Sequence, residues 1–291
     1  MNNTRMPNLF VVGAMKAATT SLHNYLALHP DIFMTRDPWK EPGFFVKELN
    51  WNKGWDWYSN LFSEAETQKF RGESSTDYTK SPHYAGVPER IHAACPDAKI
   101  IYIMRDPIER AISQYWWEVE FSAEGRNMPQ GILENPWIMN ASHYALQITP
   151  YLELFGEDNV FTLTTEALVK EPKQTLIDLF TWLGVSAEIE LPEQFDVHNK
   201  SKASVNKFIA AGLVSKLKGS FVWDILKKSI SPQLKAKLLK SMSRKVEKDD
   251  GNHADVVELL RPIMQPQVAE LTTLTGKRYD EWTTLFPATR Q

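Results

Sequence analysis

Residues that could form disulfides or bind a metal are scarce. The 291 residues include one cysteine, Cys95, which excludes an intrachain disulfide. Seven scattered histidines show no metal-ligand spacing. We therefore expect no metal, and we expect Cys95 to be a small buried residue.

Long apolar runs and internal repeats are absent as well. No segment approaches the ~20 apolar residues of a membrane-spanning helix, and the N-terminus enters a short apolar run almost at once. These features predict a cytoplasmic protein.

A strong net charge is also missing. The formal charge of -3 gives no overall attraction to nucleic acid. The balance is uneven, because residues 200–250 hold thirteen Lys and Arg against four Asp and Glu, a local +9 that leaves -12 for the rest. Such a stretch is most often a solvated helix face, but it could also line an anionic ligand's site or meet an acidic surface.

Buried strands are predicted by three short apolar runs, at residues 9–13, 99–104 and 160–165. Their continuous apolarity indicates a parallel sheet that is covered on both faces. Helical patterns lie between them, at residues 19–28, 87–94, 108–120, 143–155 and 172–183. This alternation predicts one α/β domain over residues 1–291. Its core is expected at about 8–195, with a helical C-terminal extension and lid at about 196–291.

The stretch VVGAMKAATTSLHNYL, at residues 11–26, is typical of a strand, a tight loop and a helix. A helix that starts directly after a strand presents backbone N–H groups and the positive end of its dipole, and both favour a phosphate. Lys16 adds a positive charge, and hydroxyl donors follow at Thr19, Thr20 and Ser21. A plain turn with Thr19 as its N-cap is the alternative.

This loop lacks the spacing of a nucleoside-triphosphate site. A Walker A loop is G-x-x-x-x-G-K-[ST], whereas Lys16 follows Gly13 by three residues and no second glycine comes after it. A strand that ends in a clear Mg²⁺-binding aspartate is missing too. The spacing fits a diphosphate-sized group that needs no metal, and it disfavours phosphoryl transfer from ATP.

A second phosphate signal lies in IIYIMRDPIERAISQYWWE, at residues 100–118. A buried strand delivers Arg105 to the end of the sheet, where open α/β sheets bind ligands. A helix then starts after Asp106, and Ser113 lies two turns further on. Arg105 and Ser113 can both reach one phosphate. A salt bridge of Arg105 with Asp106 or Glu109 is the alternative.

Together, VVGAMKAATTSL and IIYIMRDPIERAISQY resemble the two cofactor-binding motifs of sulfotransferases that use 3′-phosphoadenosine 5′-phosphosulfate (PAPS). Further stretches are similar to the same family: WKEPGFF, KGWDWYSNLF, GESSTDYTKSPHYAGVPERI, FGEDNVFTLTTEALVKEP and ELTTLTGKRYDEW. The likeness covers most of residues 8–195 and roughly 255–282, and it is nearest to the heparan sulfate type and its bacterial relatives. It implies a P-loop-like parallel sheet flanked by helices. It also implies sulfuryl transfer from PAPS, release of adenosine 3′,5′-bisphosphate, and no metal.

The resemblance also implies donor-binding residues. Lys16 is expected to contact the 5′-phosphosulfate and to stabilise the leaving phosphate. Backbone and hydroxyl donors would come from the rest of the loop: Ala17, Ala18, Thr19, Thr20 and Ser21. Arg105 and Ser113 are expected at the 3′-phosphate, where a late basic loop would close the site with Lys200, Ser201 and Lys202.

Glu41, in WKEPGFF, corresponds to the family's catalytic base. It would act best with a raised pKa in a partly desolvated cleft. The alternative is a surface carboxylate paired with Lys40.

Four further residues are candidates for the acceptor site: Glu73, Trp57, His143 and Tyr144. Glu73 could instead support Lys16 or form a structural pair. For the tryptophan cluster that contains Trp57, core packing is the preferred interpretation.

Two positions depart from the family pattern. Ala18 stands where a glycine is usual, which predicts that the loop needs no positive φ there. Ser74 stands where heparan-type enzymes commonly have a lysine, which weakens the case for a heparan-like acceptor.

The expected partner is a carbohydrate or small-metabolite acceptor, with a hydroxyl favoured over an amine, and neither nucleic acid nor a membrane span is expected. Two other functions stay open. One is a P-loop-type ATP-dependent kinase or NTPase, and the other is a non-catalytic module that binds adenosine phosphates or anionic glycans.

Overall fold

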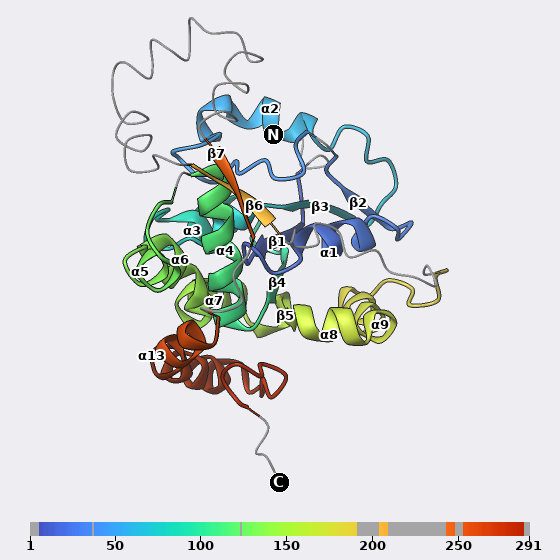
Figure 1. Cartoon of the computed structure of the whole chain (residues 1–291). Helices are drawn as coiled ribbons and strands as arrows, with labels where there is room; N and C mark the ends of the chain where they lie inside the picture. The colour runs from blue at the N-terminus through green and yellow to red at the C-terminus, as the bar shows by residue number, and fades with distance from the viewer. Residues whose placement is uncertain are drawn as a thin grey trace, which may run out of the picture.

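Five parallel strands form the central sheet (Figure 1). The computed structural model describes residues 6–36, 38–122, 124–190, 204–208, 243–247 and 253–287. The strands are β1 (Leu9–Gly13), β2 (Ile32–Met34), β3 (Phe70–Ser74), β4 (Lys99–Met104) and β5 (Val160–Thr164), in the order β2-β3-β1-β4-β5. Because every neighbouring pair is parallel, the carboxyl ends of all five strands lie at one edge of the sheet.

Helices cover both faces of this sheet. The α-helices are α1 (Thr19–Leu26), α2 (Gly54–Asn60), α3 (Val87–Ala94), α4 (Pro107–Phe121), α5 (Met128–Leu133), α6 (Pro136–Ser142), α7 (Tyr144–Phe155), α8 (Thr165–Lys170), α9 (Pro172–Leu183) and α13 (His253–Thr275). Short 3-10 turns are η2 (Trp51–Lys53), η3 (Thr76–Thr79) and η4 (Glu157–Asn159). The predicted α/β architecture is therefore confirmed.

The two faces of β1 pack into different core clusters. Leu9 and Val11 lie with side chains of α1 and α9, whereas Phe10 and Val12 lie with side chains of α3, α4 and α7. This is the alternation that a strand imposes on successive side chains. It confirms the expectation that the sheet is covered on both sides.

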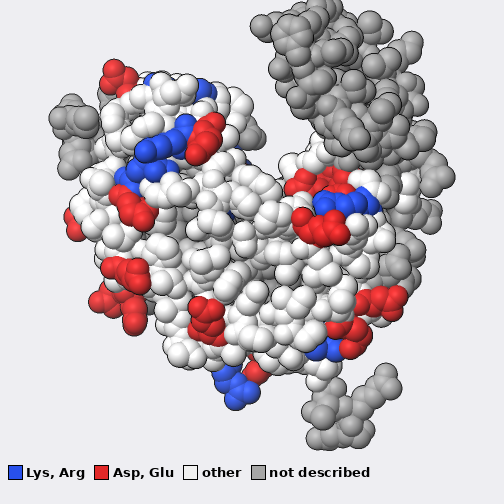
Figure 2. Space-filling view, turned by 90° about the vertical axis from the view of Figure 1, so that its left-hand side faces the viewer, with Lys and Arg blue, Asp and Glu red and all other residues white. Residues whose placement is uncertain are grey.

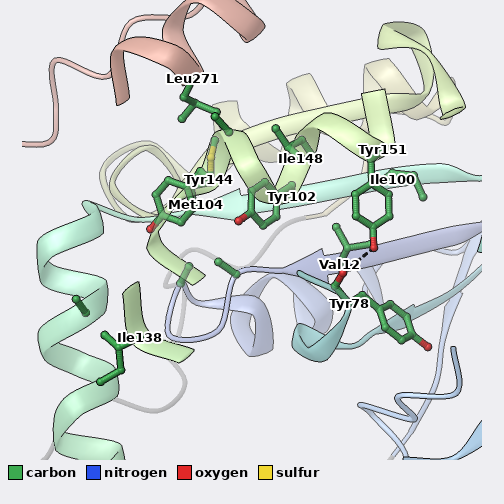
Figure 3. Packing of buried hydrophobic residues seen from close by; sticks show 14 of the residues in the cluster. Val12, Tyr78, Ile100, Tyr102, Met104, Ile138, Tyr144, Ile148, Tyr151 and Leu271 are labelled. Atoms are coloured by element: carbon green, nitrogen blue, oxygen red, sulfur yellow. Dashed lines mark hydrogen bonds between the residues drawn. The ribbon is translucent and has the colours of Figure 1, made fainter. Parts of the chain in front are cut away.

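The C-terminal helix packs on the second of these clusters. Side chains of the sheet, of α7 and of α13 meet there, among them Val12, Ile100, Tyr102, Met104, Tyr144, Ile148, Tyr151 and Leu271 (Figure 3). The Tyr151 hydroxyl also donates to the Tyr78 carbonyl at 2.9 Å. The predicted C-terminal helix is thus part of the core.

A two-stranded antiparallel sheet lies in the region that was predicted to be helical. It pairs β6 (Ser204–Phe208) with β7 (Ser243–Glu247). Val205 is buried in the larger core cluster, and β6 contacts α4. The helical prediction is wrong for these two segments, because a strand pair between residues so far apart in sequence leaves no local periodic signal.

Charged side chains of both signs lie side by side on the face shown in Figure 2, and its described part carries no broad basic patch. Most of the basic segment at residues 200–250 lies outside the described residues, as do Lys200, Ser201 and Lys202. Among the residues described, no helix is both long and apolar enough to cross a bilayer.

Candidate active site

The loop between β1 and α1 turns sharply at the carboxyl edge of the sheet. The Ala14 N–H donates to the Ile103 carbonyl of β4 at 2.6 Å, and the Ala17 N–H closes back on the Ala14 carbonyl at 3.1 Å. Lys16 and Ala18 have φ values of 70° and 61°, both in the left-handed region. The prediction that Ala18 needs no positive φ is therefore wrong. Ala18 holds a conformation that glycine adopts with less strain.

Helix α1 starts without a side-chain cap. Its N-cap position is Ala18, whose methyl group cannot accept a hydrogen bond, so the alternative of a turn capped by Thr19 is not what forms. Thr19 and Ser21 are buried, and Lys16 and Thr20 are half-buried. A tight turn that leads into a helix N-terminus at this edge of a parallel sheet is the geometry of a phosphate-binding loop.

Arg110 fastens α4 to this loop, and the sequence analysis did not identify it. Its side chain is fully buried and donates to the carbonyls of Met15 (3.4 Å) and Ile138 (2.7 Å) and to the side-chain oxygens of Ser142 (2.8 Å) and Gln114 (2.7 Å). Burial lowers the pKa of this guanidinium. Arg110 ends the motif RDPIER, five residues after the predicted phosphate ligand Arg105, and this position was the signal that could have identified it.

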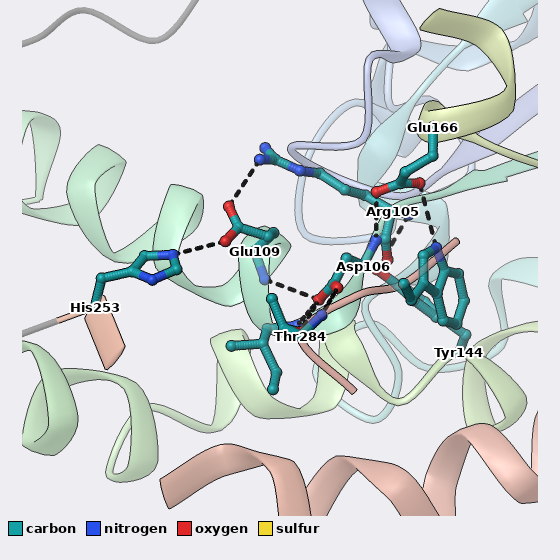
Figure 4. Close-up of polar contacts among 9 residues, drawn as sticks. Arg105, Asp106, Glu109, Tyr144, Glu166, His253 and Thr284 are labelled. Carbon is teal, nitrogen blue, oxygen red and sulfur yellow. Dashed lines mark hydrogen bonds and ion pairs between the residues drawn. The ribbon is translucent and has the colours of Figure 1, made fainter. Parts of the chain in front are cut away.

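Arg105 lies just past the end of β4, as predicted. Its Nη2 pairs with Glu109 Oε2 at 3.1 Å, and Glu109 Oε1 shares a hydrogen bond with His253 Nε2 at 2.7 Å (Figure 4). The alternative ion pair with Glu109 is therefore present. It does not exclude a phosphate, because a guanidinium has five N–H donors and this side chain is 31% exposed. Ser113 is partly exposed on α4, two turns further on.

The segment that follows α13 contacts the residues between the end of β4 and the start of α4 (Figure 4). Asp106 caps α4, and its carboxylate also accepts hydrogen bonds from the hydroxyl (2.6 Å) and the N–H (3.1 Å) of Thr284. Glu166 accepts from the Asp106 N–H at 3.0 Å and from the Trp282 indole N–H at 3.2 Å. Asp106 therefore has a structural role and is not the partner of Arg105.

Glu41 lies in the connection between β2 and η2. Its Oε1 pairs with Lys40 Nζ at 2.8 Å, and its Oε2 accepts from the Thr76 hydroxyl at 3.0 Å and from the Thr76 N–H at 3.5 Å. Burial pushes the pKa of Glu41 up, but the Lys40 charge and the Thr76 hydrogen bonds outweigh it and hold the pKa below the usual 4.5. The expected raised pKa is not found. The pair with Lys40 does form, and the carboxylate, with its side chain 39% exposed, is ionised at neutral pH.

Glu73 lies at the end of β3 with none of its surface exposed. Its carboxylate accepts hydrogen bonds from the hydroxyls of Tyr58 (2.5 Å), Tyr78 (2.7 Å) and Ser75 (2.5 Å). Burial raises the pKa of Glu73 to about 7, although these hydrogen bonds oppose the rise. A side chain with no exposed surface cannot touch an acceptor, so the structure contradicts that role for Glu73.

The other acceptor candidates lie apart from one another. Trp57 packs against Phe44 in the core, as preferred. His143 shares a hydrogen bond with Glu270 of α13 at 2.8 Å. Tyr144 is buried, and its hydroxyl donates to the Arg105 carbonyl at 2.6 Å. The structure thus places Tyr144 with the donor-site candidates and His143 beside the C-terminal helix.

The candidate site residues lie at the ends of three neighbouring strands, β3, β1 and β4. β1 lies between β3 and β4, so the loop that carries Lys16 leaves the sheet between Glu73 and Arg105. The Ser75 N–H donates to the Val11 carbonyl at 3.1 Å, which joins the β3 end to β1. In the part of the chain that the structure describes, no three His, Cys, Asp or Glu side chains gather as a metal site.

This fold and this loop define an α/β protein whose parallel sheet has, at its carboxyl edge, a loop with the geometry of a phosphate site. The chain belongs to the sulfotransferase family, whose model matches residues 7–188, well over half of the sequence. The predicted family is confirmed.

Individual relatives agree with this assignment. Mouse heparan sulfate glucosamine 3-O-sulfotransferase 3B1 is 28% identical over 190 residues, which are 62% of this chain and 47% of that protein. The membrane-associated sulfotransferase kil1 of Dictyostelium discoideum is 32% identical over 127 residues, 43% of this chain and 26% of that protein. The crystal structure of a sulfotransferase from Alicyclobacillus acidocaldarius superposes with a TM-score of 0.66 at 25% identity, covering 95% of this chain and 98% of that one. The chain thus spans about half or less of the two curated relatives.

The expectation of a cytoplasmic protein is wrong. It rested on the lack of an apolar span, yet the similar proteins include a membrane-associated sulfotransferase. The match covers only 26% of that protein, and features outside a matched portion can decide where a protein resides. The lack of an apolar span in the matched portion therefore does not indicate where the protein resides.

Replacing Ala18 by glycine should stabilise the fold. The left-handed φ of 61° strains an alanine and not a glycine. We expect Ala18→Gly to raise the free energy of unfolding by about 0.5–1 kcal/mol in urea titrations. Ala269→Gly, at an exposed position inside α13, is the control and should lower it by about 1 kcal/mol. Equal losses for both variants would contradict the observed backbone.

Glu73 should make stability fall as the pH rises from about 4.5 to about 7. Across that range the folded protein keeps a proton that the unfolded chain has released, because the pKa is raised on folding. Glu73→Gln should flatten this part of the stability profile by up to about 3 kcal/mol. The exposed Glu153→Gln should leave the profile as in the wild type. Denaturant titrations at pH 5, 6, 7 and 8 measure the difference, and parallel profiles for the wild type and Glu73→Gln would refute it.

Proposed function

We propose that the chain is a PAPS-dependent sulfotransferase that transfers a sulfuryl group to a carbohydrate hydroxyl. One arrangement carries the proposal. Lys16 lies in the loop after β1, Arg105 follows the neighbouring β4, and Glu41 is held by Thr76 just after β3 on the other side. Membership of the sulfotransferase family supports the reaction class.

The residues present fit a donor with two phosphate groups. The loop backbone turns in the manner of a phosphate site, and the half-buried Lys16 adds positive charge there. Arg105 and Ser113 are the proposed 3′-phosphate ligands. The remaining loop residues Ala17 to Ser21 would act as donors at the 5′ end. Lys200, Ser201 and Lys202 stay a prediction for closing the site.

Glu41 is proposed to take the proton of the acceptor hydroxyl as its oxygen bonds to sulfur. The bond between sulfur and the bridging phosphate oxygen breaks, and its electron pair stays on the departing adenosine 3′,5′-bisphosphate. Lys16 is proposed to stabilise that charge. Because Glu41 is ionised and paired with Lys40, we expect the acceptor hydroxyl to approach the oxygen that Thr76 holds.

A sugar hydroxyl is the proposed acceptor because one relative is named for 3-O-sulfation of glucosamine in heparan sulfate. The position where heparan-type enzymes commonly carry a lysine holds Ser74, which is fully buried, and its hydroxyl is bonded to His23 at 2.8 Å. This position offers no cation to an anionic chain. We therefore propose that the acceptor is less highly sulfated than heparan sulfate.

Glu41→Gln should abolish turnover and leave donor binding intact. Loss of a general base costs on the order of 10²–10⁴-fold in rate. Transfer of labelled sulfate from PAPS to a panel of sugars measures turnover, and calorimetry with adenosine 3′,5′-bisphosphate measures binding. Glu48→Gln, exposed nearby, is the control. Unchanged turnover in Glu41→Gln would reject the base, and tighter binding of Mg-ATP than of the bisphosphate would reject the function.

Lys40→Met should move the acidic limb of the rate profile to higher pH. The Lys40 ammonium is what chiefly opposes the effect of burial on Glu41, so its removal raises the pKa of this carboxyl. The active, ionised form then appears only at higher pH. The pH dependence of kcat/KM measures the limb, and Lys47→Met, at an exposed lysine, should leave it in place. A limb that stays or moves down in Lys40→Met would show that Glu41 is not the titrating base.

A further inference from the structure

We propose that Glu73 is a positioning residue for Glu41, and that it acts through the hydroxyls of Ser75 and Tyr78. The proposal rests on the proposed role of Glu41 as base. Glu73 itself is fully buried and cannot meet the substrate, so any part it has in the reaction must pass through other groups.

Two hydroxyl bridges connect Glu73 to the chain that follows Glu41. The Ser75 hydroxyl donates to Glu73 Oε2 at 2.5 Å and accepts from the Gly43 N–H at 2.9 Å. The Tyr78 hydroxyl donates to Glu73 Oε1 at 2.7 Å and accepts from the Phe45 N–H at 3.3 Å. Glu73 therefore holds the backbone two and four residues beyond Glu41.

The direction of these hydrogen bonds depends on the carboxylate. A hydroxyl has one proton, and once it is donated to Glu73 the oxygen lone pairs face the backbone N–H groups. Burial, reinforced by the charge of Glu73, raises the pKa of the Tyr78 hydroxyl, so this donor keeps its proton. Once Glu73 is ionised it has no proton to give, and above a pH of about 7 this buried acceptor sets the polarity of the whole network.

The same short segment also holds Glu41 and the phosphate loop. Thr76, next to Ser75, donates its hydroxyl and its N–H to Glu41. The Thr79 hydroxyl donates to the Val12 carbonyl at 2.9 Å, one residue before the end of β1. These contacts fix the position of Glu41 relative to the loop that carries Lys16. The distance between these two residues matters for an in-line transfer.

Tyr58 supplies a matched control. Its hydroxyl donates to the same Oε1 of Glu73 at 2.5 Å, and its ring stacks on Phe44 at 4.1 Å. Among the described contacts, however, this hydroxyl bonds no backbone N–H of residues 42–46. Tyr58→Phe and Tyr78→Phe therefore each remove one hydrogen bond to Glu73, but only the second breaks a bridge to the Glu41 segment.

The test combines amide hydrogen exchange with kinetics on the full chain. We expect faster exchange at the Phe45 N–H in Tyr78→Phe and at the Gly43 N–H in Ser75→Ala, with neither changed in Tyr58→Phe. In the first two variants kcat should fall on the order of tenfold to a hundredfold. The KM for PAPS and the Kd for adenosine 3′,5′-bisphosphate should change less than about twofold. Ser75→Thr keeps a hydroxyl and should restore most of kcat.

Three results would overturn the proposal. They are equal losses of kcat in Tyr58→Phe and Tyr78→Phe, unchanged exchange at both amides, or faster exchange with kcat retained. Glu41→Gln in the same assay separates the two proposals. If it keeps full turnover, the base is misassigned, and Glu73 then loses its role in positioning a catalytic group even where exchange shows that it holds the segment. If it loses turnover and the two bridge variants do not, only the present inference fails.

Discussion

The site depends on the parallel pairing of β1 with β3 on one side and β4 on the other. Parallel pairing forces three chain segments to leave the sheet at the same edge and in a set order. The loop with Lys16 comes from the middle strand, the segment that holds Glu41 follows β3, and Arg105 follows β4. Hydrogen bonds between the ends of neighbouring strands, such as Ala14 N–H to the Ile103 carbonyl, then fix the spacing of these segments.

Local patterns predicted the parts of this framework in which one periodicity dominates. The runs at 9–13 and 99–104 and the helices at 87–94 and 172–183 have the predicted bounds. Strands β2 and β3 were missed for different reasons. β2 has only three residues, and β3 reads Phe-Arg-Gly-Glu-Ser, in which polar residues interrupt the apolar pattern. The residues that hid β3 include Glu73, whose burial makes sense only with partners from distant segments.

The candidate site shows the same division. The types and order of Lys16, Glu41 and Arg105 could be predicted because the family resemblance lies in contiguous motifs. The local pairs of Glu41 with Lys40 and of Arg105 with Glu109 could be predicted as alternatives, but the supports from distant segments could not, because these are non-local. Thr284 meets Asp106 across 178 residues, and His253 meets Glu109 across 144. The expected high pKa of Glu41 failed because the charge of the neighbouring Lys40, helped by the Thr76 hydrogen bonds from 35 residues away, outweighs the effect of burial.

Glu41 and the buried Glu73 have different proposed tasks in the same site. The proposed base must be ionised at working pH, and the ion pair with Lys40 and the Thr76 donors keep Glu41 in that form. Holding Glu41 in place without covering its carboxylate requires support from buried residues. A carboxylate is suited to that task because it accepts several hydroxyl donors at once. Burial makes this support costly, as the pKa of about 7 for Glu73 indicates. A fold selected for stability alone would favour an apolar side chain at the end of β3. The proposed positioning role therefore accounts for the polar end of β3, because the Glu41 segment has little regular structure of its own to hold it.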